Sequence, residues 1–160
     1  MGAMDVHIRL AKKTDVPTLA TLFHETVVTH GPEHYTADQT AAWAASTLDT
    51  EQFEAFILGV QTYVAETAAG IVGFSGLADD GHVASLYVRH DCLNQGIGSD
   101  LLTYVIEQAR CDRLPRLYAE ASEFSRGLFQ KFGFQQYDTE VVERFGVPFT
   151  RYLMERRDLL

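Results

Sequence analysis

Two closely spaced glycines, Gly96 and Gly98, belong to the segment of this chain that is best suited to hold a ligand. They follow a strand-like apolar run over residues 83–88 and precede a helix-favouring run over residues 100–110. A tight turn from strand to helix leaves the first N–H groups of the helix without partners, and glycine lets a ligand approach them. These groups and the positive end of the helix dipole favour an anion, and a diphosphate matches their charge and size. An ordinary tight turn without a ligand is the alternative interpretation.

Two well-known phosphate-binding motifs do not fit this segment. The dinucleotide fingerprint needs Gly or Ala three residues after the second glycine, where this chain has Leu101. The P-loop ends in Gly-Lys-Ser or Gly-Lys-Thr, and no lysine lies near the segment. The segment therefore has to be interpreted together with the residues downstream of it.

A second motif lies beyond one further strand-like run. Residues 95–99 read Gln-Gly-Ile-Gly-Ser, and residues 129–134 read Phe-Gln-Lys-Phe-Gly-Phe. Together they resemble the GNAT superfamily of acyl-CoA-dependent N-acetyltransferases, and the resemblance extends from Ile8 to Met154. Residues 35–44, 121–122 and 152–155 resemble a bacterial branch of that superfamily.

The resemblance implies a binding site for acetyl-CoA (coenzyme A), the expected co-substrate. In the implied fold, the strands over residues 82–88 and 117–121 run parallel and splay apart, which opens one edge of the first strand. The pantetheine arm, which carries amide groups, is expected to add to that edge. The expected cofactor-binding residues are Leu86, Tyr87, Val88, Leu93, Asn94, Gln95, Gly96, Ile97, Gly98, Ser99, Ser122, Arg126, Phe129 and Lys131.

Two positions depart from the family pattern. Leu93 stands where the family usually has Gln or Arg, so the backbone must supply more of the contact with the diphosphate. Phe129 stands where the family often has a tyrosine acid, and it cannot donate a proton. Arg89, Arg126 and Lys131 are the nearest cations in the sequence, although Arg126 and Lys131, five residues apart, need not share a helix face.

Acyl transfer to an amine needs a proton acceptor and a donor that stabilises the oxyanion. His82 is the first candidate base, because imidazole titrates near neutral pH and its position matches that of a glutamate base in some family members. Glu120, at the end of its strand, is the second candidate. His82 is also interpretable as an exposed turn residue, and Glu120 as a surface carboxylate or one with its partners in the core. By resemblance, the amide of Val88 is the expected oxyanion donor.

The acid for the leaving thiolate is left open. Tyr152 and Tyr137 are the candidates, because a tyrosine hydroxyl can reach a site from a neighbouring strand, yet both are also ordinary strand aromatics. Departure of the thiolate without an acid is feasible too, because a thiol has a pKa of about 8.5.

The acceptor pocket is expected near Tyr35, Gln39 and Trp43. These residues are four apart along one helical stripe and provide aromatic walls around a polar centre, although core packing explains such a stripe as well. No metal is expected. Histidines 24, 30 and 34 resemble a metal cluster only loosely, because the Gly-Pro pair at residues 31–32 breaks any helical pairing between them.

Length and composition fit one soluble domain that spans residues 1–160, of which residues 1–4 resemble in part an expression scar. No apolar run approaches the roughly 18 to 20 residues that a bilayer requires. There is no charged and then apolar N-terminal leader, and Cys92 and Cys111 lack metal-like spacing. These features predict a protein of the reducing cytoplasm.

The charges are unevenly distributed. Residues 14–88 contain ten Asp and Glu residues and no Lys or Arg, whereas the remainder from Arg89 is nearly balanced; the net charge is −9. An acidic field repels nucleic acid and concentrates cations, which motivates the prediction of a cationic acceptor. A solvated surface kept for solubility is the alternative interpretation.

Hydrophobic periodicity predicts a mixed α/β (α+β) layer structure that contains an antiparallel meander. The resemblance to GNAT proteins implies helices on both faces of a mostly antiparallel central sheet of six to seven strands. By resemblance to GNAT proteins, two of these strands are parallel and splayed. Strands are expected over residues 6–10, 61–66, 70–78, 82–88, 116–120, 134–142 and 147–156. Helices are expected over residues 15–30, 36–45, 49–58, 100–111 and 122–132.

The sequence thus predicts an acetyl-CoA-dependent N-acetyltransferase that acts on a small, cationic primary amine by direct attack in a ternary complex. Two alternatives are kept: a protein lysine or N-terminal acetyltransferase with an open groove, and a CoA-sensing or partner-binding module with little catalysis. No nucleic-acid or membrane partner is expected. A homodimer in which residues 147–156 pair between subunits is left open.

Overall fold

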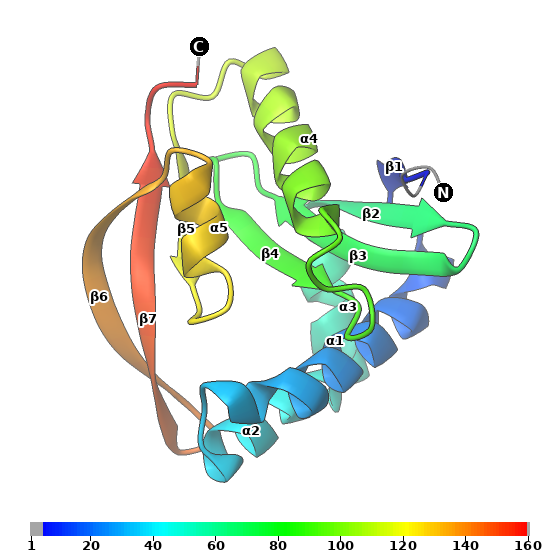
Figure 1. Ribbon diagram of the computed structural model, residues 1–160, viewed down its shortest axis with the longest axis vertical. Coiled ribbons are helices and arrows are strands. Elements are labelled where there is room, and N and C mark those ends of the chain that lie inside the picture. The colour runs from blue at the N-terminus through cyan, green and yellow to red at the C-terminus, as the bar shows by residue number, and fades with distance from the viewer. Residues whose placement is uncertain (1–4, 160) are drawn as a thin grey trace.

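The computed structural model describes residues 5–159, so the expression-scar interpretation of residues 1–4 lies outside the described chain (Figure 1). The strands are β1 (His7–Leu10), β2 (Gln61–Thr67), β3 (Gly70–Leu77), β4 (Val83–Val88), β5 (Leu117–Ala121), β6 (Gln135–Arg144) and β7 (Val147–Arg156). The α-helices are α1 (Val16–His30), α2 (Ala37–Ala44), α3 (Thr50–Leu58), α4 (Ile97–Cys111) and α5 (Arg126–Lys131). Among these elements, no helix is long and apolar enough to cross a membrane.

The strands form two antiparallel sheets, ordered β1-β2-β3-β4 and β5-β7-β6. One parallel bridge, between His82 and Tyr118, connects them. Gly81 permits this contact, because its φ is +96° and a Cβ there would lie 2.0 Å from the carbonyl oxygen of Arg116. Beyond the bridge β4 and β5 separate, as Figure 1 shows. The predicted fold class is confirmed, with the central sheet divided into two at this point.

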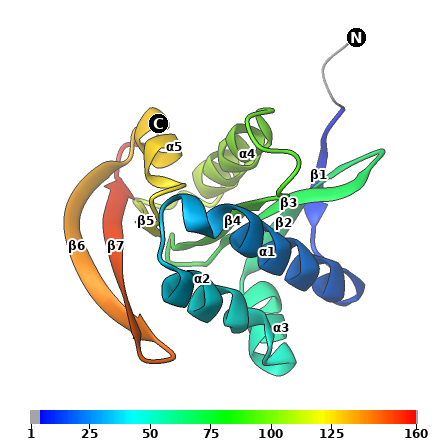
Figure 2. The same cartoon turned by 60° about the horizontal axis from the view of Figure 1, so that its bottom comes forward.

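Helices cover the first sheet on both faces (Figure 2). On one face α4 buries Leu101, Leu102 and Val105 completely. On the other face α1 and α3 bury Leu19 and Ile57, which pack in one cluster with residues of β2 and β3. Apolar residues three and four apart on each helix produce these buried faces.

Local hydrogen bonds set several element boundaries. Thr36 and Gln39 form a capping box at the start of α2, as the Thr36 hydroxyl accepts from the Gln39 N–H at 3.1 Å. Helix α5 begins at Arg126 and not at residue 122, because the Ser122 hydroxyl accepts from the N–H groups of Phe124 and Ser125 and holds a turn. Ser and Thr side chains commonly compete with helix formation in this way.

The second sheet bears on the possibility, left open above, that residues 147–156 pair between subunits. Strand β7 lies between β5 and β6 and is paired along both of its edges. Its backbone groups are therefore already used within the chain, and the outer strands of this sheet are β6 and β5, of which β5 meets the first sheet at one bridge.

Candidate active site

Two cavities meet in the region between the two sheets. The first, here called the loop cavity, has a volume of about 490 Å³ and is lined by β4, the 93–99 segment and residues of α5. The second, the hairpin cavity, has a volume of about 640 Å³ and lies between α3 and the β6–β7 hairpin. Both are lined by Trp43, Ala84, Tyr87, Glu120 and Ser122. Molecules in the two cavities would meet at these shared residues.

The free edge of β4 faces the loop cavity. The N–H of Arg89 donates to the carbonyl of Val72 at 2.8 Å, and Val88 is the partner of Gly73 in the antiparallel register. Because such pairs alternate, the backbone groups of Leu86 and Val88 point away from β3, whereas those of Tyr87 point toward it. The Thr26 hydroxyl donates to the Val88 carbonyl at 3.0 Å, and this leaves the Val88 N–H on the open edge.

The 93–99 segment forms a cradle of backbone amides. Gly96 precedes α4 with φ of +84°, a left-handed conformation that glycine adopts easily. The first hydrogen bond of the helix runs from the Asp100 N–H to the Gly96 carbonyl, so the N–H groups of Ile97, Gly98 and Ser99 have no acceptor within the helix. Leu93 and Asn94 also line the cavity, and Gln95 does not.

The predicted cations lie elsewhere. No Lys or Arg in the described chain lines the loop cavity. The Arg126 guanidinium stacks over the ring of Tyr152 at 3.9 Å, and Arg89 pairs with Asp91 at 2.7 Å. Lys131 lines a separate surface cavity, whereas Ser122 and Phe129 line the loop cavity.

The two candidate bases lie side by side. The Nε2 atom of His82 is 3.0 Å from Oε1 of Glu120, although the residues are 38 positions apart in the sequence. A carboxylate only accepts hydrogen bonds, so Nε2 carries the hydrogen and the lone pair of His82 is on Nδ1. The hydrogen bond from His82 is the largest cause that lowers the pKa of Glu120, while partial burial opposes it.

Neighbouring groups fix the orientation of His82. Its ring stacks on Tyr118 with the ring centres 4.8 Å apart, and its backbone N–H donates to Asp80 at 3.1 Å. The Tyr118 hydroxyl donates to the other oxygen of Asp80. This hydrogen bond, followed by burial, raises the pKa of Tyr118 to about 12. His82 is thereby held by contacts on its backbone, its ring face and its Nε2 atom.

Tyr87 contributes its side chain to the site, although the sequence pointed only to its backbone. The indole N–H of Trp43 donates to the Tyr87 hydroxyl at 3.2 Å. The ring packs between Phe23 and Phe74, and burial raises the pKa of Tyr87 to about 12. Within the described chain the hydroxyl hydrogen has no acceptor, so it can be donated at the shared wall of the two cavities. A tyrosine at an inward position of an apolar strand was the signal in the sequence.

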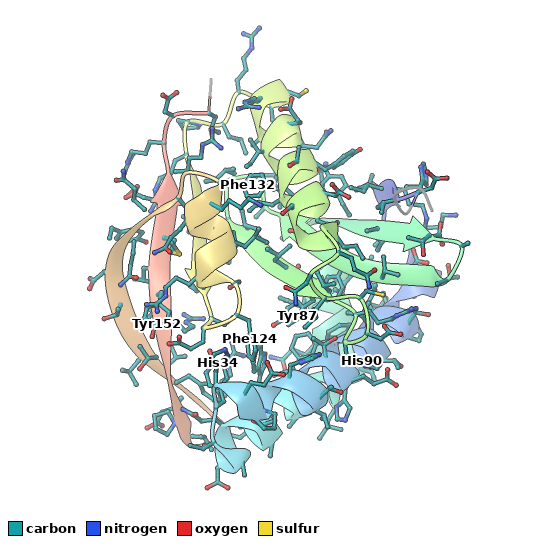
Figure 3. All side chains as sticks on the ribbon, in the orientation of Figure 1. His34, Tyr87, His90, Phe124, Phe132 and Tyr152 are labelled. Carbon is teal, nitrogen blue, oxygen red and sulfur yellow. The ribbon has the colours of Figure 1, made fainter. Side chains whose placement is uncertain are left out.

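The tyrosines predicted as acids line neither cavity. The Tyr152 hydroxyl donates to Glu123, and this bond is the main cause of the raised pKa of Tyr152. Tyr137 is 49% exposed and lies beside Arg116. In Figure 3 Tyr152 lies on the β7 side of the molecule and Tyr87 on the β4 side.

The predicted acceptor residues divide into two groups. Tyr35 packs edge-on against Trp43, with ring centres 5.4 Å apart, and both line the hairpin cavity. Gln39 does not line it, because its amide donates to the Pro148 carbonyl at 3.0 Å and accepts from the Thr36 N–H. Gln39 therefore joins α2 to β7.

The charges around the hairpin cavity differ from those of the chain as a whole. Arg144, Arg151 and Glu120 line it, and His82 adds an imidazole. Of the ten acidic residues in residues 14–88, only Glu33 lines either cavity. The acidic first half thus does not gather at the site.

The three histidines that loosely resemble a metal cluster have separate partners. His24 contacts the Ala44 carbonyl, His30 lies between Glu33 and the His90 carbonyl, and His34 packs against Phe124. In residues 5–159 no group of three or more His, Cys, Asp or Glu side chains is arranged to hold a metal ion.

Comparison with known proteins gives a consistent result. Residues 32–156 match the family model described as the acetyltransferase (GNAT) domain. The N-acetyltransferase YafP of Escherichia coli (strain K12), described as uncharacterized, is 27% identical over 150 residues, which cover 94% of this chain and 95% of YafP.

Solved structures share the fold. A GCN5-related N-acetyltransferase from Rhodopseudomonas palustris superposes with a TM-score of 0.93 and 24% identity over 98% of each chain. The PaiA N-acetyltransferase from Thermoplasma acidophilum, solved in complex with coenzyme A, has a TM-score of 0.77 and 18% identity, over 97% of this chain and all of that one.

Proposed function

This chain belongs to the GNAT acetyltransferase family, and we propose that it transfers the acetyl group of acetyl-CoA to the primary amine of a small molecule by direct attack in a ternary complex. The reaction converts an ammonium ion and a thioester into an amide, a thiol and one released proton. A GNAT relative that binds coenzyme A supports the choice of co-substrate.

The loop cavity suits coenzyme A. The unpaired N–H groups of Ile97, Gly98 and Ser99 would hold the diphosphate, and Gly96 presents no Cβ to the approaching ligand. The free edge groups of Leu86 would pair with the pantetheine amides, which leaves the Val88 N–H for the thioester carbonyl. When bound there, acetyl-CoA supplies the acetyl group as a thioester.

His82 would take the proton from the acceptor amine. An amine attacks only when it is neutral, so a nearby lone pair has to remove a proton from the ammonium form. Nδ1 of His82 carries that lone pair, because Glu120 engages Nε2 at 3.0 Å. Glu120 acts as a positioning residue that fixes the tautomer and stabilises the imidazolium.

Val88 would stabilise the carbonyl oxygen of the thioester, and Tyr87 would protonate the departing sulfur. The Val88 N–H lies on the open edge of β4 and can donate to the carbonyl oxygen as negative charge develops. Tyr87 lines both cavities, and its hydroxyl hydrogen can be donated to the departing thiolate. Tyr87 takes the role that was predicted for Tyr152, whose hydroxyl is engaged by Glu123.

The meeting of the two cavities is the observation that carries this proposal. The amide cradle lies in one cavity, His82 lines the other, and Glu120 lines both. The hairpin cavity is bounded by residues of seven elements, α1, α2, α3, β4, β5, β6 and β7, which favours a small acceptor over the open groove that a protein substrate needs. The prediction of a cationic acceptor depended on the acidic residues 14–88, of which only Glu33 lines either cavity, so the proposal is for a primary amine without a further positive charge.

The test is release of thiol from acetyl-CoA with a panel of primary amines. We expect turnover by the wild-type protein and a kcat about 100-fold lower for His82→Ala, because a positioned base contributes at least that much. His24→Ala is the matched control, since His24 lines neither cavity. Binding of coenzyme A without thiol release for every amine would refute the proposed activity. Full turnover by His82→Ala at all pH values would remove His82 from the mechanism.

A further inference from the structure

The hairpin cavity carries more positive than negative charge in a protein whose net charge is −9. Two arginines, Arg144 and Arg151, line it together with one carboxylate, Glu120. A pocket for a polycation would be expected to show the opposite balance, because like charges repel and the effect is strongest away from water. The charges instead suit a molecule that brings a negative group.

Arg151 is already engaged. Its guanidinium pairs with Glu140 and lies 3.9 Å from Glu120. Its charge is therefore divided between two carboxylates of the protein. Arg151 forms part of the cavity wall, where two carboxylates balance its charge and its buried Nε has no hydrogen-bond partner among the described residues.

Arg144 is not engaged. Among residues 5–159 it has neither an ion pair nor a side-chain hydrogen bond, and it is exposed at the end of β6. The β6–β7 turn places it at the cavity, because Arg144 pairs with Val147 across a two-residue turn. Burial is the main reason that the pKa of Tyr87 is raised, and the charge of Arg144 opposes this shift. The hydrogen bond from His82 is the main reason that the pKa of Glu120 is lowered, and the charge of Arg144 adds to this shift. Its charge thus reaches the shared wall where the amine would react.

The large uncharged side chains of the cavity are mostly aromatic. Eight Phe, Tyr and Trp rings line it: Phe23, Tyr35, Trp43, Phe53, Phe56, Tyr87, Phe145 and Phe149. Such walls favour an aromatic or large apolar body, beside the few uncharged polar side chains of Ser46, Gln52, Ser122 and Thr150. The acceptor therefore needs three parts: an amine beside His82, an anionic group beside Arg144 and an apolar body.

We propose that the acceptor is an amino acid with an aromatic or large apolar side chain, and that Arg144 recognises its carboxylate. This inference rests on the proposed function and names the substrate class for the same site. Arg144 is a specificity-determining residue here, since an arginine fork can bind both oxygens of a carboxylate. The ammonium of the amino acid is then directed to the His82 and Glu120 pair.

The experiment compares matched acceptors that differ only in the carboxylate: L-phenylalanine with phenethylamine, and L-tryptophan with tryptamine. For the wild-type protein we expect kcat/KM to be at least about tenfold higher for each amino acid, the usual value of a charge-assisted hydrogen bond. Arg144→Gln is expected to reduce this ratio at least about tenfold. Arg113→Gln, which changes another unpaired exposed arginine outside the cavity, is expected to preserve the ratio.

The outcomes separate this inference from the proposed function. Thiol release with phenethylamine or tryptamine but not with the amino acids, or an unchanged ratio in Arg144→Gln, overturns the inference and leaves the acetyltransferase activity intact. Absence of release with every amine refutes the activity. In that case calorimetry on protein saturated with coenzyme A still decides the inference, because equal affinities for L-phenylalanine and phenethylamine would overturn it.

Discussion

The site depends on which polar atoms are left free at His82 and Tyr87 once their neighbours have formed hydrogen bonds. Glu120 engages Nε2 of His82 and leaves Nδ1 free. Trp43 occupies the acceptor position of the Tyr87 hydroxyl and leaves its hydrogen free. By contrast, the hydroxyl of Tyr152 is used by Glu123. Tyr87 and Tyr152 have the same side chain, but only Tyr87 has a hydroxyl hydrogen that is free to be donated.

Tyr87→Phe is expected to lower kcat by about tenfold to 100-fold, because it removes the hydrogen that would go to the departing thiolate. KM for acetyl-CoA should change little, since the backbone of Tyr87 belongs to the sheet. The unfolding free energy should fall by about 1 kcal/mol, because Trp43 loses its acceptor. Steady-state kinetics and urea unfolding measure both effects, with Tyr137→Phe as the control. A kcat equal to that of the wild type would exclude Tyr87 as the acid.

Glu120→Gln is expected to reduce stability in a pH-dependent manner. The folded pKa of Glu120 is lowered from its ordinary 4.5, first by the hydrogen bond from His82. A lowered folded pKa contributes stability that is present above the unfolded pKa and is lost as pH falls through the folded pKa. Urea unfolding should therefore show a deficit of about 1 to 3 kcal/mol at pH 7 that shrinks toward pH 3.

The control for that measurement is Glu143→Gln, which changes an exposed carboxylate without an ion pair among the described residues. A deficit in Glu120→Gln that stays constant from neutral to acid pH would contradict the assignment.

Among the elements, the start of α4 and the β6–β7 turn matter most for the site. Gly96, with φ of +84°, ends the preceding segment so that three helix N–H groups face the loop cavity. Phe145 and Gly146, with φ of +51° and +78°, form the two-residue turn that places Arg144 at the hairpin cavity. Positive φ at both central positions is typical of the tight turns that match strand twist.

Gly98→Val is expected to raise KM for acetyl-CoA at least about tenfold. The new side chain would occupy the cradle beside Leu128, whose Cδ2 lies 3.0 Å from the position of a Cβ at residue 98. Leu128 has to move to admit the new side chain, so the melting temperature is measured beside KM to separate a loss of stability from a loss of the cradle. Gly127→Ala is the control, because a Cβ there meets no atom within 4 Å and the residue lines neither cavity. Equal KM values for the two variants would contradict the cradle.

The whole molecule is acidic, and this affects a polyanionic co-substrate. The net charge is −9, and no Lys or Arg of the described chain lines the loop cavity. Long-range repulsion is screened by salt, whereas hydrogen bonds from backbone amides are screened much less.

We also propose that residues 1–160 form one domain. The support is that Ile8 and Leu86 each pack against two of the three buried clusters.

Salt is therefore expected to leave KM for acetyl-CoA unchanged or to lower it between about 20 and 200 mM. Leu93→Arg should restore the side-chain contact that family members usually have. We expect it to lower KM about threefold to tenfold at low salt, and to lose this advantage at high salt. A wild-type KM that rises steeply with salt would show that a cation outside the loop cavity binds the phosphates.

Much of the architecture could be predicted from the sequence because it depends on local patterns. Helical spacing of apolar residues located α1 to α4, and the two glycines with the Phe-Gln-Lys-Phe-Gly-Phe segment indicated the family and the amide cradle. Candidates such as His82 and Glu120 were visible as residue types. Their hydrogen bond was not, because it depends on the register by which β4 and β5 meet at one bridge.

The sequence by itself determined the fold class and the family, since periodicity and short motifs are properties of neighbouring residues. Only the tertiary structure decided which polar atoms remain free: it left the hydroxyl hydrogen of Tyr87 without an acceptor, engaged Tyr152 and Gln39 elsewhere, and brought Arg144 to the cavity. Those outcomes arise from contacts between residues far apart in the chain, and a shift in the register of a strand would change the contacts that the strand makes.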